Sequence, residues 1–144
     1  MATAARVLGV RLQHLDVKPG HDFDALFAAA KKEDAECVLL VESPRAVANR
    51  VLIADLGIKY RLPVMSQFSI VVQAGALLSY GPALTDLFRR AAVYVDKILR
   101  GAAAGDLPIE QPSTYELVIN LRTAKALGVT LPPSLRLRAD RVVE

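Results

Sequence analysis

The chain has 144 residues, of which 53% are apolar and 23% are charged, and its formal net charge is +3. These values suit one globular domain and exclude a disordered chain. No apolar run approaches the roughly 20 residues of a membrane-spanning helix, and the first residues lack the pattern of a secretory signal peptide. The single cysteine, Cys37, excludes an internal disulfide and is expected to pack as a small core residue.

Helical and strand patterns alternate along the first half of the chain. Residues 2–8 have the pattern of the end of a helix, and residues 10–17 that of a strand. Asp22 can cap a helix, the apolar run 37–41 is typical of a strand covered on both faces, and Pro44 fits the first turn of another helix. The apolar stripes of these two helices consist of Phe23, Leu26, Phe27 and Ala30, and of Val47, Val51, Ala54 and Ile58.

The second half continues the alternation. Residues 62–66, 76–80 and 115–119 are predicted strands. Pro82 is expected to open a long helix that ends at Gly101, whereas Asn120 is expected to cap a short helix that ends at Gly128. A last helical turn is predicted from Ser134. The long helix is expected to bury an apolar stripe in the domain, formed by Leu84, Leu87, Phe88, Ala91, Val95, Ile98 and Leu99.

This alternation of strands and helices predicts an α/β fold with three αβα layers and a largely parallel sheet. The sequence carries no recognisable catalytic or cofactor motif: it lacks a nucleophile elbow, a phosphate-binding loop and a dinucleotide fingerprint. His14 and His21 have no further histidine or cysteine at ligand spacing. We therefore expect no catalytic residues, no metal, no cofactor and no enzyme activity.

Basic residues are frequent in the second half, but few aromatic residues lie between them. We therefore expect solvated helix faces rather than a nucleic-acid site. The basic residues concerned are Arg89, Arg90, Arg122, Lys125, Arg136, Arg138 and Arg141.

Polar and aromatic residues that follow the predicted strands are the candidates for ligand contacts. Ligands of open α/β sheets bind at the carboxyl ends of the strands. Glu42 could hold an ammonium group, and Ser43 or Ser66 could donate to a carboxylate, unless these residues are ordinary caps and turns. An aromatic side chain could stack on a flat ligand. The predicted ligand-binding residues are Glu42, Ser43, Ser66, Gln67, Phe68 and Tyr80.

An ordered series of motifs runs through the second half of the chain. It comprises Ser79-Tyr80-Gly81-Pro82, then Leu87-Phe88-Arg89-Arg90, Asp106-Leu107-Pro108-Ile109, and Asn120-Leu121-Arg122-Thr123. From about Ala5 to Glu144, and most strongly from Ala74, the chain resembles the C-terminal part of bacterial ABC-transporter substrate-binding proteins with the type I periplasmic-binding-protein fold. The resemblance implies a single truncated unit, residues 1–144, in which about 5–75 match the second lobe and 76–144 match the return toward the first lobe and the C-terminal region.

The same resemblance implies a function. Members of the family bind a small solute, in several cases an amino acid, in a cleft that closes between two lobes, and they deliver it to an ABC permease. It implies a periplasmic location, although the chain as given has no signal peptide and would stay in the cytoplasm unless a leader is missing.

The match begins after the point at which relatives carry a leader, most of a first lobe, and the first strand and helix of the second. Uncovered apolar strand edges favour association, so we expect a homodimer or larger assembly. The alternatives are a structural or oligomerisation module without a specific ligand and, with less support, a small enzyme whose site forms between subunits.

Overall fold

The computed structural model describes residues 1–17 and 22–144. Its strands form one sheet in the order β1-β2-β3-β4-β5. β1, β2 and β3 are parallel, β4 is antiparallel to β3, and β5 is parallel to β4. The fold is therefore α/β with a mostly parallel sheet, as predicted. The strands are β1 (Val38–Leu40), β2 (Val64–Ser66), β3 (Leu78–Pro82), β4 (Tyr115–Asn120) and β5 (Arg141–Val143).

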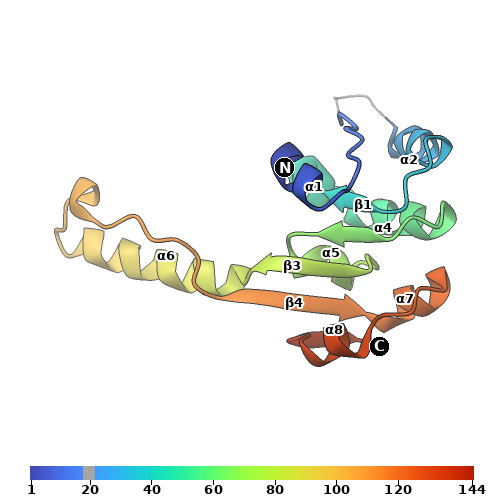
Figure 1. Ribbon diagram of the computed structural model, residues 1–144. Coiled ribbons are helices and arrows are strands. Elements are labelled where there is room, and N and C mark those ends of the chain that lie inside the picture. Colours follow the sequence, from blue (N-terminus) through green and yellow to red (C-terminus); the bar gives the residue numbers. More distant parts are fainter. Residues whose placement is uncertain (18–21) are drawn as a thin grey trace.

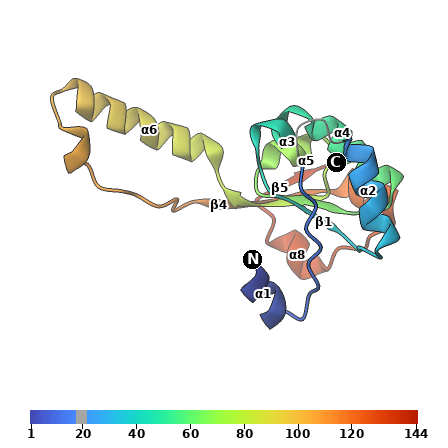
Figure 2. The same ribbon diagram turned by 90° about the horizontal axis from the view of Figure 1, so that it is seen from above.

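Helices lie on both sides of this sheet. Figure 2 shows α2, α3, α4 and α5 over one face and α1 and α8 on the other. None of the helices in residues 1–17 and 22–144 is long and apolar enough to cross a membrane. The helices are α1 (Ala2–Val7), α2 (Phe23–Lys32), α3 (Pro44–Ala48), α4 (Arg50–Lys59), α5 (Ser69–Gln73), α6 (Leu84–Leu99), α7 (Leu121–Leu127) and α8 (Pro133–Leu137), with a 3-10 turn at Ala104–Asp106.

The hydrophobic core lies between one face of the sheet and the helices α2, α4 and α5 that cover this face. Phe23, Phe27 and Ala30 of α2 are buried there and Leu26 is partly buried, which confirms the predicted stripe of that helix. Gly57 lets α4 approach the sheet closely, because a Cβ at this position would lie 2.7 Å from Cγ2 of Val64.

Three expectations for the first half are wrong. Residues 10–17 form no strand, because β1 pairs with β2 alone and this segment does not join the sheet. Val10 and Leu12 are exposed, and only Leu15 packs on the core. Cys37 is exposed rather than buried, and it lies directly before β1, which is an edge strand of the sheet.

The third error concerns the helix after Pro44, which breaks at Asn49 into α3 and α4. The break changes the helical phase. Val51 and Ile58 are consequently exposed, whereas Ile53 and Leu56 enter the core.

The long helix α6 leaves the domain. Figure 1 shows it projecting beyond the end of β3, with the chain returning alongside it to β4. We call residues 83–114 the arm. At its base the amide of Ala83 donates to the carbonyl of Thr114 at 3.1 Å. No residue of α6 is buried, so the prediction that its apolar stripe packs inside the domain is wrong. Pro82, expected to open the helix, is the last residue of β3.

Candidate functional site

The carboxyl ends of β1, β2 and β3 meet at one edge of the sheet, because these strands are parallel. We call this edge the rim; it comprises residues 41–43, 66–68 and 79–82. Ser66 donates a hydrogen bond from its hydroxyl to Oε1 of Glu42, and its Oγ accepts one from the amide of Phe68 at 3.1 Å. The structure therefore brings together two of the predicted loops, through the side chain of a fully buried serine.

Two oxygen atoms at the rim are buried without a hydrogen-bond partner among the described residues. They are Oε2 of Glu42 and Oγ of Ser79, and Ser79 is the neighbour of Ser66 in the sheet register. An unpaired buried carboxylate oxygen is costly, so a cation or another donor at this point would be stabilised. Sequence reasoning marked the strand end that contains Ser79 but did not select its hydroxyl.

The loop after β2 lies directly on β3. A Cβ at Gly81 would come within 2.2 Å of the carbonyl oxygen of Gln67. Only a residue without a side chain therefore fits beneath this loop, and the position of Gln67 and Phe68 depends on that contact.

Ser43 has a local structural role. Its hydroxyl oxygen accepts the amide of Ala46 at 3.2 Å and caps α3, while the residue stays exposed at the rim. The hydroxyl hydrogen is still able to point toward a ligand, because capping uses only the oxygen as an acceptor.

Tyr80 lies on the other face of the sheet. Alternation along β3 places it opposite to Ser79, and its ring stacks on Tyr115 with centroids 5.9 Å apart. Together with Gln67, Leu39 and Met65, the two tyrosines line an open cavity of about 550 Å³ that also reaches Ser66. The predicted site residues are thus divided between two faces, and a ligand that contacts both Glu42 and Tyr80 has to lie across the rim.

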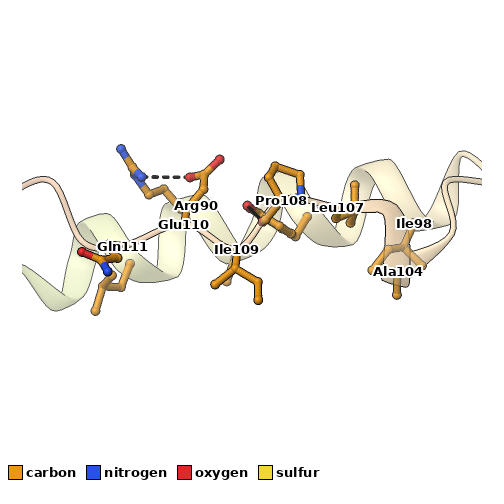
Figure 3. A pocket seen from close by; sticks show the side chains of 11 residues that line it. Arg90, Ile98, Ala104, Leu107, Pro108, Ile109, Glu110 and Gln111 are labelled. Atoms are coloured by element: carbon orange, nitrogen blue, oxygen red, sulfur yellow. Dashed lines mark hydrogen bonds and ion pairs between the residues drawn. The ribbon is translucent and has the colours of Figure 1, made fainter.

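A second cavity, of about 470 Å³, lies in the arm between α6 and the returning chain. Leu87, Ala91, Ile98 and Ile109 are among the residues that line it. Figure 3 shows Arg90 and Glu110 joined on one side of the arm, at 2.9 Å, and Ile109 pointing to the other side. This cavity is the place where the arm packs on itself, and its lining is mainly apolar.

The polar contacts of this arm cavity lie at its edge. Tyr94 donates from its hydroxyl to the carbonyl oxygen of Pro108 at 2.6 Å. Partial burial, followed by hydrogen bonding to Glu110, raises the pKa of the Tyr94 phenol above its usual 10.0. In residues 1–17 and 22–144, no group of three or more His, Cys, Asp or Glu side chains is placed to hold a metal ion. His21 lies outside the described residues.

The carboxyl ends of the strands, where the polar groups of this mostly parallel sheet converge, are the place at which open α/β sheets bind ligands. A family model described as ABC transporter substrate binding protein matches residues 1–143. The chain therefore belongs to this family, whose members bind substrates, are not catalytic, and are usually periplasmic or extracellular. No curated protein shows significant sequence similarity to it.

Several solved structures share the fold, and three of them have low sequence identity to this chain. A conserved domain protein from Vibrio cholerae O1 biovar El Tor is 22% identical with a TM-score of 0.90, and 98% of this chain covers 47% of it. An ABC domain in complex with L-Trp from Streptococcus pneumonia is 20% identical with a TM-score of 0.87, and 98% of this chain covers 49% of it.

The third is the ligand-free, open structure of a substrate-binding protein with adhesive properties from Clostridium difficile. It is 17% identical with a TM-score of 0.69, and 99% of this chain covers 47% of it. The chain thus spans about half the length of the solved structures it resembles.

Proposed function

We propose that this chain is a solute-binding unit of an ABC transporter, without catalytic activity, and that a small molecule such as an amino acid binds at the rim. The observation that carries the proposal is the Glu42–Ser66 pair. Ser66 fixes one oxygen of the carboxylate, while the other oxygen is buried without a partner. An ammonium group would satisfy that oxygen through a charge-assisted hydrogen bond.

The remaining rim residues suit the other parts of an amino acid. Ser43 and the exposed Gln67 offer donors to a carboxylate, because the Ser66 hydroxyl is already engaged with Glu42. Phe68, which is partly buried, and Tyr80, which is 55% exposed, offer flat apolar surfaces to a side chain. The complex of one structural neighbour with L-Trp makes an aromatic amino acid the first candidate.

The proposal includes the mechanism and partners of the family. Residues 5–75 would supply elements of the second lobe, and residues 76–144 would supply the C-terminal region and the return to the first lobe, toward which the arm would extend. The two lobes would close around the solute by hinge motion. The protein would then deliver the solute to a membrane permease, and its location would be periplasmic.

A second candidate function is a structural or oligomerisation module that binds no specific solute. The observation that favours it is the arm, whose apolar side chains are exposed along α6.

Thermal-shift measurements with the twenty amino acids, L-Trp first, distinguish the two candidates. A specific ligand at 100 times its Kd stabilises the fold by about 2.7 kcal/mol. We expect such a shift for the wild type and for Glu36→Gln, in which an exposed carboxylate distant from the rim is neutralised. Glu42→Gln removes the charge with almost no change of shape, and we expect it to weaken binding by about 10- to 100-fold.

Calorimetric titration of the same three proteins gives the Kd values. Binding by Glu42→Gln with the wild-type Kd would remove Glu42 from the site. The absence of a shift with every amino acid would favour the structural module.

A further inference from the structure

The two unpaired oxygen atoms of the rim belong to neighbouring strand ends. In residues 1–17 and 22–144, the buried side-chain atoms without a hydrogen-bond partner are Oε2 of Glu42 and Oγ of Ser79. Ser79 is fully buried, and the register of β2 and β3 pairs it with Ser66. Paired residues of adjacent strands point to the same face, so the two hydroxyl groups lie roughly one strand spacing, about 4.8 Å, apart.

The two serines differ in what the fold does with their hydroxyl groups. That of Ser66 is fully used, because it donates to Oε1 of Glu42 and accepts the amide of Phe68 at 3.1 Å. That of Ser79 has no partner among the described residues. A buried hydroxyl without a partner destabilises a fold, and alanine would occupy the same place without this cost. The hydroxyl of Ser79 is therefore not explained by the stability of the domain.

The chemistry of the two atoms defines the group that would connect them. A carboxylate only accepts hydrogen bonds, whereas a hydroxyl accepts and donates. The connecting group therefore needs a hydrogen for Glu42 and a second polar contact for Ser79. A primary ammonium has three hydrogens, and its charge strengthens the bond to the carboxylate. Residues 41–43, 66–68 and 79–82 include no lysine or arginine, so no cation of the rim itself competes for this position.

Residues of this chain already shield both atoms from solvent. The loop at Gln67 lies on Gly81, two residues beyond Ser79 on the same face of β3. A group that reaches the two oxygens consequently has to displace this loop or turn the Glu42 carboxylate. Once there, it would be bound out of contact with bulk water, where a charge-assisted hydrogen bond is strong.

We propose that Ser79 is a specificity-determining residue of the rim. Its hydroxyl and Oε2 of Glu42 together bind the primary ammonium group of the solute, while Ser66 positions the carboxylate. The site rejects a quaternary ammonium, which has no hydrogen to donate to either oxygen. This assignment rests on the solute-binding function proposed above, to which it adds a residue and the chemical group that the residue selects.

Urea denaturation of the protein without solute tests whether the Ser79 hydroxyl is unpaired. Ser79→Ala is expected to raise the midpoint of unfolding, because it removes an unpaired polar group. Ser66→Ala makes the same change at the paired neighbour and should lower the midpoint. Ser134→Ala, at an exposed position of α8, should leave it unchanged. A midpoint of Ser79→Ala below that of the wild type would mean that the fold or a structural water uses the hydroxyl, and would overturn the proposal.

Methylammonium chloride, compared with tetramethylammonium chloride at the same concentration, tests the group that the site selects. At about 200 mM, methylammonium should raise the Tm of the wild type by about 1–2 °C more than tetramethylammonium does. Ser79→Ala and Glu42→Gln should lose this difference, whereas Ser134→Ala should keep it. No difference in the wild type, or an equal difference in Ser79→Ala, would overturn the proposal.

Calorimetric titration with the amino acids separates this proposal from the proposed function. An amino acid that binds Ser79→Ala and the wild type with the same Kd would leave the solute-binding function intact but remove Ser79 from the site. If methylammonium acts as expected and no amino acid binds, the ammonium site is supported and the solute is an amine of another class.

Discussion

Gly81 determines how the loop after β2 lies on the rim. The carbonyl oxygen of Gln67 occupies the space that any side chain at position 81 would need. The loop therefore rests on the backbone of β3, and the amide of Phe68 is free to bind Ser66 at 3.1 Å. One residue without a side chain thus couples the third strand to the Glu42–Ser66 pair.

Gly81→Ala is expected to lower the free energy of unfolding by about 1–3 kcal/mol, the usual cost of overpacking a close contact, because the Cβ would displace the backbone of Gln67. It should also weaken solute binding at the rim. Urea denaturation and calorimetric titration measure the two effects. Gly105→Ala is the control, since a Cβ there meets no atom within 4 Å; equal stability of the two variants would contradict this account of the loop.

Among the secondary-structure elements, Asn120 connects β4, α7 and α5. It is the last residue of β4, and its Oδ1 accepts the amide of Thr123 at 3.0 Å and so caps α7. Its Nδ2 donates to the carbonyl oxygen of Val72 in α5 at 3.2 Å. Because the residue is buried, both bonds are shielded from water. The position of α7 and the adjoining β5 depends on them.

Asn120→Ala is expected to cost about 1–3 kcal/mol of unfolding free energy, because it removes a helix cap and leaves a buried carbonyl unpaired. Asn120→Asp keeps the capping oxygen but cannot donate to Val72. If both bonds matter, its stability in urea should fall between those of the wild type and the alanine variant. Equal losses in both variants would show that the cap contributes little.

Elements with a local signal could be predicted from the sequence. The apolar runs at 38–40, 64–66 and 115–119 are strands, and Asn120 and Gly128 bound a helix as expected. Gly128 has the positive φ, 70°, that ends a helix. β5 and α5 were missed, because three to five residues are too few to show a period.

Elements that depend on distant contacts could not be predicted. An amphipathic pattern shows which side of a helix is apolar but not what covers it, so the exposure of α6 followed only from the structure. The rim is similar: residue order predicted that Glu42 and Ser66 share an edge, whereas the placement of Tyr80 on the opposite face required the register of β2 and β3.

At the scale of the whole molecule, the arm enters and leaves the domain at one point. β3 and β4 are antiparallel neighbours, with Pro82 opposite Tyr115 and the amide of Ala83 bonded to Thr114. The two ends of the arm are therefore adjacent, in a geometry that a two-residue turn can join. Nothing in α6 is buried, so the core of the domain does not include it.

Replacement of residues 84–113 by Asn-Gly should accordingly give a folded protein with cooperative urea unfolding. Circular dichroism during a urea titration measures this property. Loss of cooperative unfolding would mean that the arm stabilises the domain.

Because the arm joins the domain only at its base, a small rotation there would move its far end by a larger distance. A helix of 16 residues is about 24 Å long, so a rotation of about 10° at the base moves the far end by about 4 Å. Tyr80 and Tyr115 stack on each other at this pivot, next to the rim. A small rotation of the arm at this pivot would therefore be measurable as a displacement of a spectroscopic label at Ala103.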